Sequence, residues 1–81
     1  MIVTYDTLAE AFYFQLKPKA KIAKTVELNP NTLVDLDENN DLVGVELLHP
    51  SPTNLRRVAQ QFHRPELSKV DTEKLQEAFC G

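Results

Sequence analysis

The sequence predicts an α+β fold in which an antiparallel β-meander of about five strands is followed by two helices. In residues 33–48 apolar and charged side chains alternate, and the alternation is interrupted by a polar segment at residues 38–41, as is typical of a hairpin. From Ser51 onward the apolar residues recur at helical spacing instead. Because a sheet with one apolar face must be covered, the two helices are expected to pack on that face.

The length and composition predict one small domain. The chain has 81 residues, of which 42% are hydrophobic and 26% are charged, as in ordinary globular proteins. We expect residues 1–81 to form a single domain, with the β-meander in residues 1–49 and a helical tail in residues 50–81.

Five segments have the alternation and composition of strands. They are residues 2–5, 11–16, 22–28, 33–37 and 42–48. Pro18 ends the second strand because proline cannot donate to a ladder, and Asn29-Pro30-Asn31 predicts a turn after the third.

The strand register is predicted from the residues that must share the core. The expected pairs are 34 with 45, 36 with 43, 26 with 36 and 28 with 34, which sets Glu27 opposite Asp35. The expected core face contains Phe12, Phe14, Leu16, Ile22, Val26, Leu28, Val34, Leu36, Val43, Val45 and Leu47. The expected opposite face contains Tyr13, Thr25, Glu27, Asp35, Asp37 and Glu46.

Two helices are predicted in the C-terminal third. Ser51 is an N-cap followed by a proline, and it opens a helix at residues 52–63 whose apolar stripe includes Leu55 and Val58. Asp71 caps a second helix, which is expected at residues 72–79.

One motif has the spacing of calcium ligands. The residues in the positions of EF-hand ligands are Asp35, Asp37, Asn39, Asp41 and Glu46. An EF-hand loop is flanked by helices, whereas both flanks here alternate with period two, and Asn40 stands where the motif has glycine. The solvated hairpin is therefore the favoured interpretation, and no metal or other cofactor is predicted.

Four carboxylates are expected on the face opposite the core. They are Glu27, Asp35, Asp37 and Glu46. Catalytic carboxylate pairs need burial to drive their pKa values apart, and an open sheet face does not supply it. We therefore interpret these residues as a binding surface for a basic protein partner. A small hydrolytic or metal-dependent enzyme using the same carboxylates is the alternative, and no catalytic residue is assigned.

The remaining reactive side chains are expected to have structural roles. A cysteine–histidine dyad would have to combine Cys80 with His49 or His63. Cys80 lies one residue from the chain end, where fraying would not hold a catalytic thiol in place.

Charge and targeting signals exclude several classes of protein. Residues 1–49 carry four lysines against eight acidic residues, and the whole chain has a net charge of −3, which argues against a dedicated nucleic-acid binder. Arg56, Arg57 and Arg64 form a local basic patch, but the link between the two helices is too long for a helix-turn-helix motif. No apolar run is long enough to span a membrane, and the segment MIVTYD lacks the basic and long apolar parts of a signal peptide. The single cysteine fits the reducing cytoplasm, so we expect a cytoplasmic protein.

The N-terminal half resembles a known family. The segment Val3-Thr4-Tyr5-Asp6-x-x-Ala9-Glu10-Ala11-x-Tyr13, the Thr25–Leu28 strand and the hairpin that follows are similar, in this order, to the bacterial family called domain of unknown function 2283. Glu10 replaces the usual acid, and Asn40 stands near the usual turn glycine. The resemblance covers about residues 2–48 and leaves the helical tail outside.

The resemblance implies a β-meander and brings no activity or catalytic residues with it. Members of the family are similar in size to antitoxins and tend to be linked with small putative toxins. The small size, the acidic sheet face, the exposed edge strands and the helical tail lead to the main hypothesis, a non-enzymatic, cytoplasmic protein-interaction module in the manner of an antitoxin. A structural homodimer formed through an edge strand or the helices is a further alternative.

Overall fold

The computed structural model describes residues 1–49 and 51–80, with the side chain of Cys80 outside the description. The chain divides into two compact units, Met1–His49 and Pro50–Gly81. The expectation that they form one domain, with the helices packed on the sheet, stays a prediction.

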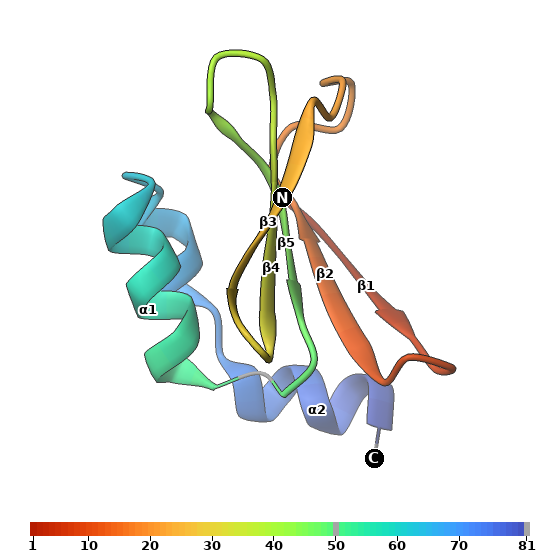
Figure 1. Cartoon of the computed structure of the whole chain (residues 1–81). Helices are drawn as coiled ribbons and strands as arrows, with labels where there is room; N and C mark the ends of the chain where they lie inside the picture. Colours follow the sequence, from red (N-terminus) through yellow and green to blue (C-terminus); the bar gives the residue numbers. More distant parts are fainter. Residues whose placement is uncertain (50, 81) are drawn as a thin grey trace. The chain divides into compact units, whose positions relative to one another are not determined.

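The first unit is a five-stranded antiparallel sheet (Figure 1). Its strands are β1 (Ile2–Asp6), β2 (Ala11–Gln15), β3 (Lys24–Asn29), β4 (Thr32–Leu36) and β5 (Leu42–Leu47). The order in the sheet is β1-β2-β5-β4-β3, so β3, β4 and β5 form a meander and the β1–β2 hairpin adds to its β5 side. The second unit contains two α-helices, which confirms the α+β fold class.

Short polar side chains close two of the turns, including the predicted turn after the third strand. Asp6 Oδ1 accepts the backbone N–H groups of Leu8 and Ala9, and Asn29 Oδ1 accepts that of Asn31. Each turn thereby gains hydrogen bonds that the sheet ladder cannot supply.

The register between β3 and β4 differs from the expected one. Glu27 lies opposite Leu33, and Thr25 takes the expected place of Glu27 opposite Asp35. The tight turn pairs Asn29 with Thr32, and a bulge between Glu27 and Asn29 then sets the register. The prediction was wrong because it maximised apolar pairing, whereas turn geometry determines the register of a short hairpin.

The β4–β5 hairpin confirms one predicted pair and corrects the other. Val34 pairs with Val45 as expected, but Leu36 pairs with Leu42 and not with Val43. The register shift beside Leu36 leaves Val43 as an extra residue, a β-bulge. The Val43 carbonyl accepts the backbone N–H groups of Leu16 and Lys17, so the bulge anchors the chain leaving β2.

The loop between β4 and β5 closes around Asp37. Its backbone N–H donates to the Asp41 carbonyl at 3.0 Å, and its carbonyl accepts the N–H of Asn40. Asn40 has φ 65°, in the left-handed region that asparagine tolerates better than most residues. Asn40 therefore performs the backbone role of a turn glycine.

One face of the sheet carries most of the buried apolar residues of this unit. Its fully buried large side chains include Phe12, Phe14, Val34, Leu42, Val45 and Leu47. Ile22 was expected there but is 48% exposed, because β3 begins at Lys24 and Ile22 lies in the preceding connection. Leu16, Val26 and Leu28 are only half-buried.

The C-terminal unit contains α1 (Pro52–Gln61), a 3-10 helix η1 (Pro65–Lys69) and α2 (Thr72–Cys80). Both predicted N-caps are confirmed: Ser51 Oγ accepts the N–H of Asn54, and Asp71 Oδ1 accepts that of Lys74.

The 3-10 helix was not predicted, because its segment is too short to show a period. It follows the end of α1, where His63 has φ 55° and the Arg64 N–H bonds back to the Ala59 carbonyl. This reversal brings η1 into contact with α1.

Candidate functional site

The register places a row of four side chains on the face of the sheet opposite Phe12 and Phe14. Across β2, β5, β4 and β3 the row contains Tyr13, Glu46, Leu33 and Glu27. Glu27 is exposed, and the other three are half-buried. We call these four residues the acidic row.

Asp35 lies beside the acidic row, at the centre of a hydrogen-bond network that joins three strands. Tyr13 Oη donates to Asp35 Oδ2 at 2.8 Å, and Thr25 Oγ1 donates to Asp35 Oδ1 at 2.6 Å. Both carboxylate oxygens are therefore engaged. Asp35 stays on the face predicted for it, and both of its oxygens accept hydrogen bonds from side chains of β2 and β3.

Gly44 makes the network possible. It lies on β5 between Gln15 of β2 and Asp35 of β4, and the ring of Tyr13 extends over it to reach Asp35. A Cβ at Gly44 would overlap the Tyr13 hydroxyl and would lie 2.9 Å from Cε2. This role of Gly44 could not be predicted from the sequence, because it depends on the pairing of β2 with β5.

The surroundings of Tyr13 favour its protonated form. Burial raises the pKa of the Tyr13 phenol well above its usual range, and the hydrogen bond to Asp35 and the charges of Asp35 and Glu46 raise it further. The phenol therefore remains a hydrogen-bond donor in neutral solution, and it positions Asp35.

Asp37 was expected within a strand on this face, but it lies beyond the end of β4. Because the bulge ends the regular ladder at Leu36, Asp37 is the first residue of the β4–β5 loop. Its Oδ1 accepts the backbone N–H groups of Asn39 and Asp41, and Lys17 Nζ lies 3.2 Å from its Oδ2. Asp37 closes the loop.

The loop carboxylate should contribute to stability in a pH-dependent way. The pKa of Asp37 lies below its ordinary 3.8 because the backbone N–H groups of Asp41 and Asn39 and the ammonium of Lys17 favour the ionised form. Because the pKa is lower in the folded state, the ionised carboxylate of Asp37 stabilises the fold above pH 3.8. This stabilisation is lost as the pH falls through the pKa of the folded state.

We therefore expect the D37N variant, which keeps an acceptor oxygen but has no charge to lose, to show a smaller drop in Tm on acidification than the wild type. The measurement is thermal unfolding followed by circular dichroism from neutral pH to pH 3. The control is D6N, because Asp6 also closes a turn but has no ion-pair partner among the described residues. Equal acid sensitivity of D37N and the wild type would contradict this role.

The five candidate metal ligands are distributed among different tasks. Asp35 belongs to the Tyr13 network, Asp37 and Asp41 both contact Lys17 Nζ, Asn39 is exposed in the loop, and Glu46 is in the acidic row. Among the described residues, no group of three or more His, Cys, Asp or Glu side chains is arranged to hold a metal ion.

The two histidines belong to different segments of the chain. His49 is exposed just after β5, and His63 is exposed in the turn between α1 and η1. The dyad hypothesis involves the Cys80 side chain, which lies outside the described residues.

Comparison with known proteins identifies the sheet unit. The family described as "Protein of unknown function (DUF2283)" matches residues 2–51, which is more than half of the chain. The chain belongs to this family. The DUF2283 match contains all five strands and ends where α1 is about to begin, so the helical unit lies beyond it.

Two further searches add no relatives. No protein with a curated description and no solved structure matches the chain. Across the part of the chain that the structure describes, no helix combines the length and apolarity needed to cross a membrane.

Proposed function

We propose that this DUF2283 protein is a non-enzymatic protein-interaction module that binds a basic protein partner through the acidic row. The observation that carries the proposal is the arrangement of that row, in which Leu33 lies directly between Glu27 and Glu46 and Tyr13 completes it. Tyrosine and apolar side chains supply contact area at protein interfaces, while peripheral charges select and orient the partner.

The carboxylates of the row differ from those that have structural partners. Neither Glu27 nor Glu46 forms an ion pair with a described residue, whereas Asp37 contacts Lys17 and Asp35 accepts two hydrogen bonds. Two negative charges are thus available for a cationic surface. A basic toxin neutralised by this module in the cytoplasm is the partner that we favour, and the enzyme alternative has less support because Asp35 and Asp37 are already engaged.

Reversing the two row charges should weaken partner binding strongly. We expect the double variant E27K/E46K to capture the basic partner at least about tenfold less well than the wild type, because like charges then face each other. The measurement is quantitative co-purification from the native host, followed by titration of the identified partner at two salt concentrations.

The matched control is E10K/E38K, which makes the same change in net charge at two exposed acids in turns of the sheet unit, outside the row. Retained binding by this control and loss in E27K/E46K support the proposal. Equal behaviour of the two double variants would overturn it, since binding would then depend on overall charge or on another surface.

Self-association is the second candidate, because β1 is an edge strand of the sheet and its Ile2 is 50% exposed. Analytical ultracentrifugation of the purified chain distinguishes a homodimer from a monomer that awaits a partner.

A further inference from the structure

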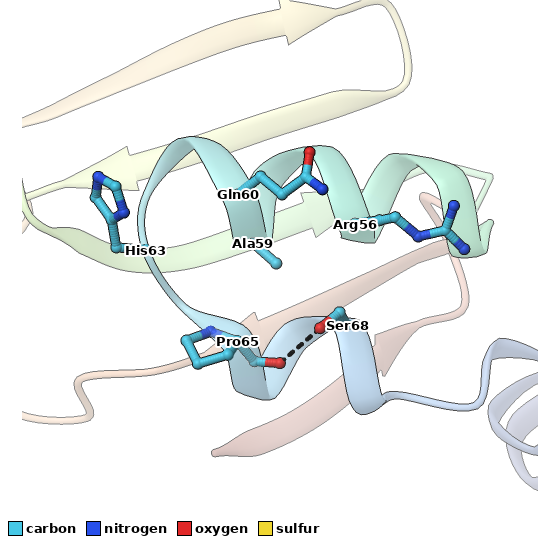
Figure 2. A pocket seen from close by; sticks show the side chains of 6 residues that line it. All are labelled: Arg56, Ala59, Gln60, His63, Pro65 and Ser68. Carbon is cyan, nitrogen blue, oxygen red and sulfur yellow. Dashed lines mark hydrogen bonds between the residues drawn. The ribbon is translucent and has the colours of Figure 1, made fainter.

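The second unit contains a groove between α1 and η1 (Figure 2). Its volume is about 540 Å³, within the range of pockets that hold small molecules. The groove is lined by Arg56, Ala59, Gln60, His63, Pro65 and Ser68. All six belong to the helical unit, and the groove is therefore independent of the acidic row and of the function proposed for it.

The lining supplies hydrogen-bond donors without any carboxylate. Arg56, Gln60 and His63 follow one another at spacings of four and three residues, which places them on the same side of α1 and its C-terminal turn. No side chain of the three forms a hydrogen bond or ion pair with another described residue. Their guanidinium, amide and imidazole N–H groups are thus available to a ligand.

The other lining residues shape the groove. Ala59 is 5% exposed and has a small side chain, which leaves space between α1 and η1. Ser68 Oγ donates to the Pro65 carbonyl at 2.8 Å, so its hydroxyl proton is used within η1 while its lone pairs remain available. Figure 2 shows Pro65 and Ser68 on η1, across from Arg56 and Ala59 on α1.

The local charge favours an anion. Arg57 and Arg64 lie next to the lining residues in the sequence, and no acid occurs from Leu55 to Pro65. Glu66, in the first turn of η1, is the nearest opposing charge in the sequence, and it does not line the groove. Figure 2 shows Arg56 and His63 at opposite ends of the lining, with Ala59 and Gln60 between them.

We propose that this groove binds a small molecule bearing a phosphate or carboxylate group, which is held at the end formed by Arg56 and Gln60. A guanidinium presents two parallel donors to the oxygens of such a group, and the Gln60 amide adds a third. His63 then contacts a second polar part of the ligand at the opposite end, over the apolar surface of Ala59 and Pro65.

The test is an NMR titration of the isotope-labelled full chain with inorganic phosphate and, separately, with succinate. Sodium chloride at matched ionic strength is the reference. We expect saturable shifts of the Arg56 and Gln60 side-chain N–H signals and of the Ser68 amide with at least one of the two anions. Response to phosphate alone or to succinate alone identifies which oxyanion the site prefers, and either result supports the proposal.

Three variants make the assignment specific. R56Q should weaken the binding by about tenfold, as expected for the loss of a charge-assisted contact, and Q60E should weaken it by adding a like charge. R57Q removes the same charge from the next residue, which does not line the groove, and should change the affinity less than twofold. Shifts that chloride reproduces, or an equal loss in R56Q and R57Q, would overturn the proposal.

Discussion

Replacing Gly44 by valine is expected to destabilise the sheet unit by about 2–4 kcal/mol, because the new side chain would occupy the space of the Tyr13 ring. Tyr13 would have to rotate away, and its hydrogen bond to Asp35 would be lost. Chemical denaturation followed by circular dichroism measures the change. A loss of less than about 0.5 kcal/mol would show that the ring can leave Gly44 at little cost.

A double-mutant cycle separates this effect from strand propensity. In a Y13A background the ring is absent, so G44V should be close to neutral or stabilising, because valine suits a strand better than glycine. If G44V lowered the free energy of unfolding equally in both backgrounds, the Tyr13 ring would not be the reason that position 44 requires glycine.

Removing the Asp35 carboxylate should have the second largest effect. D35A is expected to cost about 2–3 kcal/mol, since it leaves the half-buried Tyr13 hydroxyl and the Thr25 hydroxyl without their common acceptor. The same variant should lower the pKa of Tyr13 toward its ordinary value, because both the hydrogen bond and the charge of Asp35 raise it. Denaturation and an ultraviolet titration of the tyrosines measure the two effects.

Two controls bracket this prediction. T25A removes a single hydrogen bond at an exposed residue and should cost only about 0.5–1 kcal/mol. E27A removes an acid without a described ion-pair partner from the same face and should be nearly neutral. If E27A proved as destabilising as D35A, the effect would come from general electrostatics of the face and not from the network.

The sequence was sufficient to predict the five strands and the two α-helices, but not all of the strand pairings. Period-two alternation located the strands, and the helical N-caps at Ser51 and Asp71 were confirmed. The predicted register of β3 was wrong by two residues, since Thr25 and not Glu27 lies opposite Asp35. A shift of two residues leaves every side chain on the same face, so the alternation in the sequence cannot reveal it. The bulge at Val43 was missed for a related reason, since both Leu42 and Val43 are apolar and both are buried.

The same limits apply to the candidate site. Glu27, Asp35 and Glu46 could be placed on one face because alternation determines the face of a residue inside a strand. Asp37 could not, because it lies just past the point where the bulge ends the ladder. The roles of Tyr13 and Gly44 depend on contact between β2 and β5, whose long connection gives no local signal of which strands become neighbours.

The side chains around Gly44 also determine how the sheet opens. Through Tyr13, Asp35 and Thr25 a continuous line of contacts runs from β2 over β5 to β4 and β3. We therefore expect these four strands to unfold as one cooperative unit. β1 lies beyond the end of that line, held to β2 by backbone pairing and by the contact of Tyr5 with Phe12, whose ring centroids are 4.7 Å apart. Partial unfolding of the sheet should therefore begin with β1, exposing the β2 edge before any other strand separates.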